Sequence, residues 1–122
     1  LWERKITLIV PVPLHSRRKR KRGFNQAEIV AKVLSENTGI AMDAGAVKRI
    51  KATSPQKELG DKGRKRNIRG AFAVQKNVKG ENIVLIDDIY TTGSTLDEAA
   101  RVLKKAGAEN VYFLTVSIGQ GI

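Results

Sequence analysis

The chain has 122 residues, of which 41% are apolar, and this suits a single domain, 1–122, with one hydrophobic core. It has no cysteine and one histidine, which excludes a disulfide framework, a thiolate or histidine-rich metal site and a catalytic thiol. Its first apolar stretch is short and broken by Pro11 and Pro13, so we expect neither a signal peptide nor a membrane span, and a cytoplasmic location.

The net charge of +11 is unevenly distributed along the chain. Residues 1–80 contain 20 Lys/Arg against 6 Asp/Glu, a balance of +14, whereas residues 81–122 contain 3 against 6, a balance of −3. The first two thirds therefore face an anionic partner, and nucleic acid and polyphosphate metabolites both fit.

The first half of the chain predicts a strand, a basic run, a helix and a second strand. A β-branched run ending in Pro-Val-Pro predicts a strand over Ile6–Val12. Six consecutive like charges, Arg17–Arg22, favour a loop or a frayed helix start. Apolar residues at helical spacing then begin at Asn25 and stop at Gly39, and a short strand follows over Val47–Ile50.

The second half begins with a polar, basic stretch at 51–70, punctuated by glycine and proline, which we interpret as a mobile loop. A short strand is predicted at Ala71–Val74, and the apolar run Ile83–Ile86 is typical of a central parallel strand. A helix follows over Thr95–Ala106, with a capping box of Thr95 and Glu98 and with lysines in its last turn.

The last predicted strand is Asn110–Val116, so a strand, a helix and a strand follow one another through short turns. This order is typical of a parallel crossover. The predicted fold class is α/β, an open, mainly parallel sheet with helices on both faces.

The most informative segment is Ile83–Thr95, in which two adjacent carboxylates end a buried strand and a hydroxyl-rich loop leads into a helix. Ligands of open α/β sheets bind at the carboxyl ends of strands. The backbone N–H groups and hydroxyls of Thr91–Thr95 suit a phosphate, with Gly93 allowing close approach. Asp87 and Asp88 would repel a phosphate but can accept hydrogen bonds from vicinal hydroxyls. A ligand that has both a phosphate and two such hydroxyls is a ribose 5-phosphate. The alternative is a capped helix after an acidic turn.

This segment resembles the phosphoribosyl pyrophosphate motif of type I phosphoribosyltransferases, whose core is Rossmann-like. The resemblance implies that Asp87 and Asp88 are catalytic residues that hold the ribose hydroxyls. It implies also that the loop after them holds the 5-phosphate; its residues are Ile89, Tyr90, Thr91, Thr92, Gly93, Ser94 and Thr95.

Further motifs are similar to those of the competence protein F (ComF) proteins. They are Val-Pro-Val-Pro-Leu-His at 10–15, Arg-Gly-Phe-Asn-Gln-Ala at 22–27 and Gln-Lys-Glu-Leu at 56–59, followed by Arg64, Asn67 and Gly-Ala-Phe at 70–72. Members of that family commonly carry a cysteine-rich zinc-binding segment before the first of these motifs. This chain has no cysteine, so we expect it to correspond to the C-terminal domain alone.

The resemblance places a pyrophosphate site in the turn after the first strand, at Leu14, His15, Ser16 and Arg17. His15 either donates to pyrophosphate or transfers a proton, or it is a turn histidine with a local hydrogen bond. The stretch 51–70 corresponds to the loop that closes over substrate in type I enzymes, where Arg64 would be a catalytic residue that binds the leaving pyrophosphate. The alternative is a solvated basic loop.

The basic run exceeds what one pyrophosphate needs, so it is either a nucleic-acid patch or a solvated surface. Its residues are Arg17, Arg18, Lys19, Arg20, Lys21 and Arg22.

Two functions are therefore expected. The first is phosphoribosyl transfer from phosphoribosyl pyrophosphate, with Mg²⁺ held mainly by the ligand and no direct protein metal ligands. The second is an accessory role in DNA uptake, as ComF resemblance implies, through single-stranded DNA or competence proteins. A homodimer is compatible with both, and the acceptor of the phosphoribosyl group is open.

Overall fold

The computed structural model describes residues 5–13, 25–50, 69–88 and 93–116, with only the backbone described for Asp88 and Ser94. Its elements in chain order are β1 (Leu8–Pro11), α2 (Gln26–Thr38), β2 (Ala41–Met42), β3 (Val47–Arg49), β4 (Phe72–Val74), β5 (Asn82–Asp88), α4 (Gly93–Lys105) and β6 (Asn110–Val116). The predicted mobile loop at 51–70 lies almost entirely outside the described residues, apart from its last two positions.

The main sheet has the strand order β2-β1-β5-β6, and every neighbouring pair in it is parallel. β5 pairs with β1 on one side and with β6 on the other, which confirms the central parallel strand predicted at Ile83–Ile86. The crossover from β5 through α4 to β6 joins adjacent parallel strands, as the sequence predicts.

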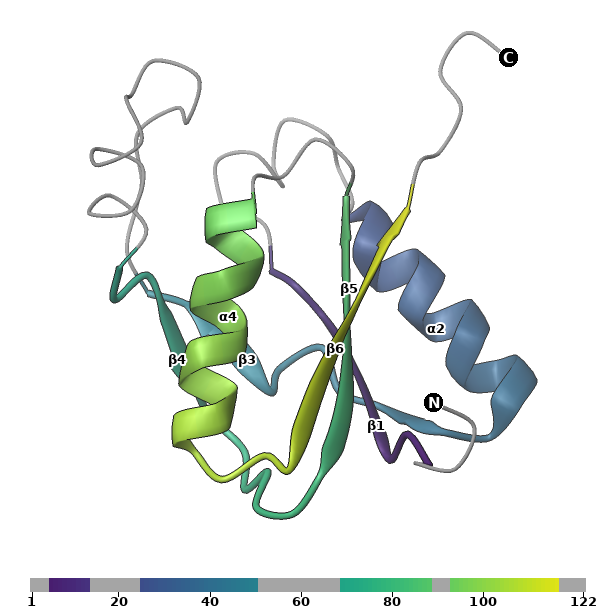
Figure 1. Cartoon of the computed structure of the whole chain (residues 1–122). Coiled ribbons are helices and arrows are strands. Elements are labelled where there is room, and N and C mark those ends of the chain that lie inside the picture. Colours follow the sequence, from purple (N-terminus) through teal and green to yellow (C-terminus); the bar gives the residue numbers. More distant parts are fainter. Residues whose placement is uncertain (1–4, 14–24, 51–68, 89–92, 117–122) are drawn as a thin grey trace, which may run out of the picture.

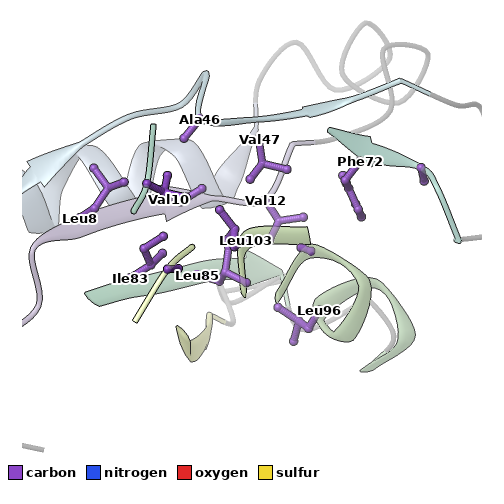
Figure 2. Close-up of a cluster of buried hydrophobic side chains, with 14 residues drawn as sticks. Leu8, Val10, Val12, Ala46, Val47, Phe72, Ile83, Leu85, Leu96 and Leu103 are labelled. Atoms are coloured by element: carbon purple, nitrogen blue, oxygen red, sulfur yellow. The ribbon is translucent and has the colours of Figure 1, made fainter. Parts of the chain in front are cut away.

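The two helices cover opposite faces of this sheet (Figure 1). Successive residues of a strand point to opposite faces, and the two buried clusters follow that alternation. Ile9 and Ile86 pack with Ala27 and Ala31 of α2. The other face carries the larger cluster (Figure 2), whose buried side chains are Leu8, Val10, Val12, Ala46, Val47, Ala71, Phe72, Val78, Ile83, Leu85, Leu96, Ala99, Leu103 and Ala108. The predicted fold class is confirmed.

β3 and β4 form a separate two-stranded antiparallel sheet that packs beside α4. Val47 and Phe72 contribute its buried side chains to the larger cluster. The strands predicted at 47–50 and 71–74 are therefore confirmed, although the sequence did not indicate that they pair with each other. β2 was not predicted, because two residues carry no period that a sequence pattern can reveal.

α2 begins and ends where the sequence indicates. The Asn25 side chain accepts a hydrogen bond from the Ala27 N–H at 3.0 Å and so caps the helix. Gly39 adopts the left-handed conformation with φ of 76°, and its N–H donates to the Ser35 carbonyl at 2.9 Å. No helix within the described ranges is long and apolar enough to cross a membrane.

Asn25 has a second role, because its Nδ2 donates to the Val12 carbonyl at 3.2 Å. Asn25 is 7% exposed, so both of its hydrogen bonds are made away from water. One side chain therefore joins the start of α2 to the end of β1.

We predict that Asn25→Ala destabilises the fold by about 1–3 kcal/mol, because it removes a helix cap and leaves a buried carbonyl without its donor. Urea unfolding followed by circular dichroism measures the loss. The control is Asn37→Ala, since Asn37 is exposed on the same helix and its side chain donates to the Val33 carbonyl one turn earlier. Equal losses in the two variants would contradict the role given to Asn25.

Candidate functional site

The candidate site lies at the carboxyl end of β5. The ladder with β6 continues through Asp87↔Thr115 and Asp88↔Val116, so the two aspartates are the last residues of the strand. Asp87 has a polar side chain, yet the residue is only 2% exposed. Carboxyl groups this deeply buried are held by hydrogen bonds or ions in folded proteins. The structure thus places Asp87 where open α/β sheets bind ligands.

The end of β1 lies at the same edge of the sheet. Pro11 is the register partner of Ile86, and the Val12 N–H donates to the Ile86 carbonyl at 2.9 Å. The chain therefore leaves β1 at Pro13 and leaves β5 at Asp88 from neighbouring positions. This pairing brings Val12 and Pro13 to the edge where Asp87 and Asp88 end β5, whereas the predicted pyrophosphate turn at 14–17 lies outside the described residues.

Both main helices begin at this edge (Figure 1). Asn25 fixes the first turn of α2 against Val12, and α4 begins at Gly93, five residues after β5 ends. A helix N-terminus carries a partial positive charge and unpaired N–H groups, which favour anions. Thr95, in the first turn of α4, is 3% exposed and so belongs to the interior of this edge.

Most other predicted site residues lie outside the described ranges, and their roles stay predictions. They are Leu14, His15, Ser16, Arg64, Ile89, Tyr90, Thr91, Thr92 and the basic run Arg17–Arg22. Gly93 and Ser94 are described only as the first residues of α4, and Asp88 only as the last residue of β5.

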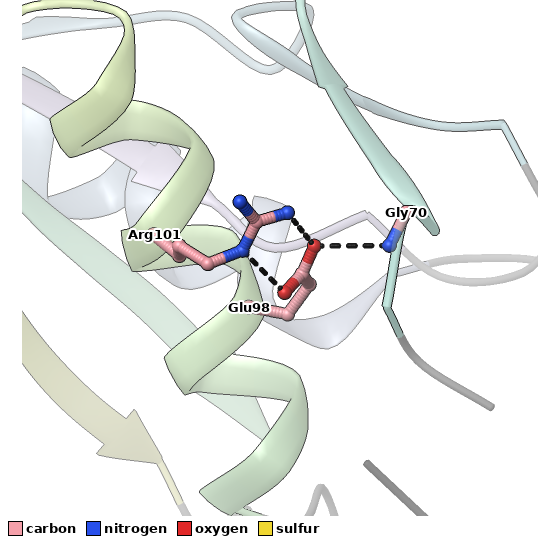
Figure 3. Close-up of polar contacts among 3 residues, drawn as sticks. All are labelled: Gly70, Glu98 and Arg101. Atoms are coloured by element: carbon pink, nitrogen blue, oxygen red, sulfur yellow. Dashed lines mark hydrogen bonds and ion pairs between the residues drawn. The ribbon is translucent and has the colours of Figure 1, made fainter. Parts of the chain in front are cut away.

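Glu98 has a role that the sequence did not reveal. Its carboxylate accepts hydrogen bonds from Arg101 Nε at 2.8 Å, from an Arg101 terminal nitrogen at 2.7 Å and from the Gly70 N–H at 3.0 Å (Figure 3). The predicted capping box of Thr95 and Glu98 is wrong, because α4 begins two residues before Thr95, which leaves Thr95 inside the helix. Both Glu98 oxygens bond other partners instead. The i, i+3 spacing of Glu98 and Arg101 in a predicted helix was the sequence signal that could have indicated their ion pair.

This contact fixes Gly70, where the chain returns from the stretch 51–68, against α4. At the other side of that stretch, the Ile50 N–H donates to the Ala71 carbonyl at 2.7 Å. The Arg49 guanidinium lies 5.3 Å from the centre of the Phe72 ring. The β3–β4 pair and α4 therefore pack together, and hydrogen bonds attach Ile50 and Gly70, on either side of the stretch 51–68, to this unit.

The Arg101 guanidinium is the main cause of a lowered pKa at Glu98, and the Gly70 N–H lowers that pKa further, whereas burial opposes the shift. Glu98 is therefore a structural carboxylate that stays ionised at neutral pH. Among the described residues no group of three or more His, Asp or Glu side chains could hold a metal ion.

Fold and site together define a parallel α/β domain with acidic residues at a strand end and helix N-termini around them. Residues 6–118 match the model of the phosphoribosyl transferase domain family, and the chain belongs to that family. The structure resembles that of the allosteric regulatory enzyme of purine biosynthesis, with a TM-score of 0.57 and 21% identity, over 91% of this chain and 22% of that one. This likeness concerns the fold.

Curated relatives confirm the resemblance to competence protein F. The chain is 43% identical over 103 residues to the DNA utilization protein YhgH of Escherichia coli (strain K12), covering 84% of this chain and 45% of the relative. It is 42% identical over 106 residues to competence protein F of Haemophilus influenzae, at 84% and 46% coverage. Competence protein ComFC of Bacillus subtilis is 36% identical over 112 residues, at 89% and 43%. The chain thus spans a little under half the length of these relatives.

We predict that Glu98→Gln lowers stability at neutral pH by about 1–3 kcal/mol, the usual cost of losing a hydrogen-bonded charge. The folded-state pKa of Glu98 lies below its ordinary value of 4.5, so the stabilisation is fully present above that value and is lost as the pH falls through the lowered pKa. Urea unfolding at pH 7 and at about pH 3 should show the difference between wild type and variant shrinking at the lower pH.

The matched control is Glu109→Gln, because the Glu109 side chain is exposed and only its backbone carbonyl accepts a bond from Lys104. A pH-independent effect of Glu98→Gln would show that the ionised carboxylate is not what stabilises this contact.

Proposed function

We propose that this domain binds phosphoribosyl pyrophosphate at the carboxyl edge of β5 and transfers its phosphoribosyl group to an acceptor, releasing pyrophosphate. The observation that carries the proposal is a buried Asp87 at the end of β5, with α4 beginning five residues later at the same edge. The motif that contains Asp87 is long, and the match to the phosphoribosyl transferase domain supports the same assignment.

Asp87 and Asp88 would bind the ribose. Ionised carboxylates accept strong hydrogen bonds from two neighbouring hydroxyls, and each such bond contributes about 1.5–3 kcal/mol. Their negative charge also favours the positive charge that develops on the ribose ring as the leaving group departs. This is the sense in which we propose a catalytic role for the pair.

The 5-phosphate would bind in the loop Ile89–Thr95, against the first turn of α4. A phosphate there receives backbone N–H groups and the positive end of the helix dipole, without needing a lysine. The hydroxyls of Thr91, Thr92, Ser94 and Thr95 supply further donors. The arrangement keeps the anionic phosphate beyond the strand end and the polyol beside it.

The pyrophosphate would lie between the turn Leu14–Arg17 and Arg64. In the reaction, the acceptor's lone pair forms a bond to the anomeric carbon while the bond from that carbon to pyrophosphate breaks, and its electron pair leaves with pyrophosphate. Positive charge from Arg64, Arg17 and the N–H groups of the turn stabilises the departing anion. Mg²⁺, bound mainly through ligand oxygens, would neutralise part of the same charge.

We predict that the wild-type domain binds phosphoribosyl pyrophosphate in the presence of Mg²⁺ and that the double variant Asp87→Asn/Asp88→Asn binds at least about tenfold more weakly, as the loss of charged hydrogen bonds implies. Isothermal titration calorimetry measures both affinities. Circular dichroism establishes that the variant is folded.

The charge-matched control is Asp97→Asn, since Asp97 is exposed on α4. Equal binding by wild type and the double variant would overturn the ribose assignment. Release of pyrophosphate in the presence of candidate acceptors separates a transferase from a domain that binds without turnover.

A second candidate is an accessory module that binds single-stranded DNA. Two observations favour it: the balance of +14 over residues 1–80, and relatives named for DNA utilization and competence. Each phosphate contacted by Lys or Arg releases bound counterions, so such binding weakens steeply with salt. The run Arg17–Arg22 is the densest source of this charge.

We predict for this candidate that replacing Arg17–Arg22 with glutamine abolishes binding to a labelled oligonucleotide, measured by fluorescence anisotropy at several salt concentrations. The slope of log K against log salt should be about −0.7 per phosphate contacted by wild type. The control replaces three exposed lysines near the C-terminal end of α4 with glutamine. They are Lys79, Lys104 and Lys105. If the Arg17–Arg22 variant retains full affinity, the run is not a DNA site.

A further inference from the structure

β6 is an edge strand of the main sheet. It pairs with β5 along its whole length, and none of the other described strands pairs with its second side. In Figure 1 β6 crosses in front of β5, with α4 on one side and α2 on the other. The outer backbone groups of a seven-residue strand are therefore available for pairing within the described structure.

Nothing in the sequence of β6 protects this edge. Proteins usually guard long edge strands with lysine, proline, a bulge or an inward charge, because bare edges pair with other strands. β6 reads Asn-Val-Tyr-Phe-Leu-Thr-Val, without a charged residue, proline or glycine, and its register with β5 is continuous. Phe113 is 48% exposed and Leu114 is 41% exposed.

The hydrogen bonds of β5 establish which groups of β6 point outwards. The carbonyls of Asn82 and Ile86 accept from Thr7 and Val12 on the β1 side. Backbone groups alternate along a strand, so Ile83, Leu85 and Asp87 face β6. In a parallel pair, the partner of a residue that faces the neighbouring strand turns its own groups away. The N–H and C=O of Val111, Phe113 and Thr115 therefore point outwards.

We propose that a second copy of this chain pairs with β6 in an antiparallel arrangement, with Phe113 on the two-fold axis. In that register Phe113 lies opposite Phe113 of the partner subunit, and Val111 lies opposite Thr115 of the partner subunit. All of these residues have outward-pointing groups, so each opposed pair exchanges both of its hydrogen bonds. Between them, Tyr112 lies opposite Leu114 of the partner subunit. Aromatic–aromatic and aromatic–aliphatic pairs are those that stabilise adjacent strands.

The self-complementarity of β6 favours a second copy over another occupant. A two-fold interface requires one surface to match itself, and the sequence on either side of Phe113 does so in apolar character and in backbone direction. The strand is uncharged in a chain of net charge +11, so pairing opposes no like charges along it. The axis runs perpendicular to the sheet, which keeps α2 with α2 and α4 with α4 on each face.

This proposal is independent of the proposed function. Antiparallel pairing points the carboxyl edges of the two sheets in opposite directions. Each copy therefore keeps its own β5 end, and none of the described residues of β6 belongs to the proposed ribose or phosphate site. Loss of the dimer should leave ligand binding at Asp87 unchanged.

Sedimentation velocity across a concentration series tests the proposal. We expect the wild type to be dimeric at about 100 µM, within the weak range of specific association. Phe113→Lys should be monomeric there, because two lysines would meet at the axis. Thr115→Pro should also be monomeric, because it removes an N–H that points away from β5. Val33→Lys is the control, since Val33 is 51% exposed on α2, and it should remain dimeric.

Charge pairing separates interface loss from misfolding. Phe113→Glu alone should be monomeric, and an equimolar mixture of Phe113→Lys and Phe113→Glu should form a dimer, because opposite charges then meet at the axis. A monomeric wild type, which would mean that another polypeptide or nothing covers β6, overturns the proposal. So does a Phe113→Lys dimer, or a mixture that stays monomeric.

Discussion

The parallel pairing of β1 with β5 is the constraint on which the rest of the structure depends. The register from Leu8↔Ile83 to Pro11↔Ile86 places two strand ends side by side and turns alternate residues to two different helices. A slip of one residue would exchange the faces, sending Ile9 to the α4 side and Val10 to the α2 side. The register is therefore set by burial on both faces. The same register fixes the positions of the strand ends at the candidate site.

Acidic residues in the C-terminal third have two distinct explanations. Asp87 is buried at the carboxyl end of β5, where we propose that the ribose binds. Glu98 is nearly as buried, yet its oxygens are engaged by Arg101 and Gly70, which makes it part of the framework. Burial of a carboxylate alone therefore does not distinguish a ligand site from a structural contact. Position does, because Asp87 ends a central strand of the sheet whereas Glu98 lies within α4.

The sequence predicts those features whose causes are local. α2 is bounded by an asparagine cap and a left-handed glycine, and β6 by its β-branched pattern, so both have the predicted limits. Contacts between distant residues were not predictable. Glu98 meets Gly70, 28 positions away, and β3 meets β4 across the stretch 51–68. The capping box was inferred from the local spacing of Thr95 and Glu98. In the structure Glu98 instead bonds Arg101 on the same helix and the distant Gly70. Of the candidate site, Asp87 and Thr95 are placed as buried residues at the expected edge, while the loop residues remain predictions.

The two proposed functions depend on different charges of the same fold, with Arg17 common to both. A strand end with a buried Asp87 and with helix N-termini nearby suits one small ligand with a phosphate and hydroxyls, because charge and polarity change within a few residues. A polyanion such as DNA needs distributed positive charge, which lies in residues 1–80 and not at Asp87. Asp87 and Asp88 would repel DNA, so the proposed ribose end of the site does not suit DNA. Arg17 belongs both to the proposed pyrophosphate turn and to the basic run, so DNA bound by the run and pyrophosphate bound by the turn would compete for this residue.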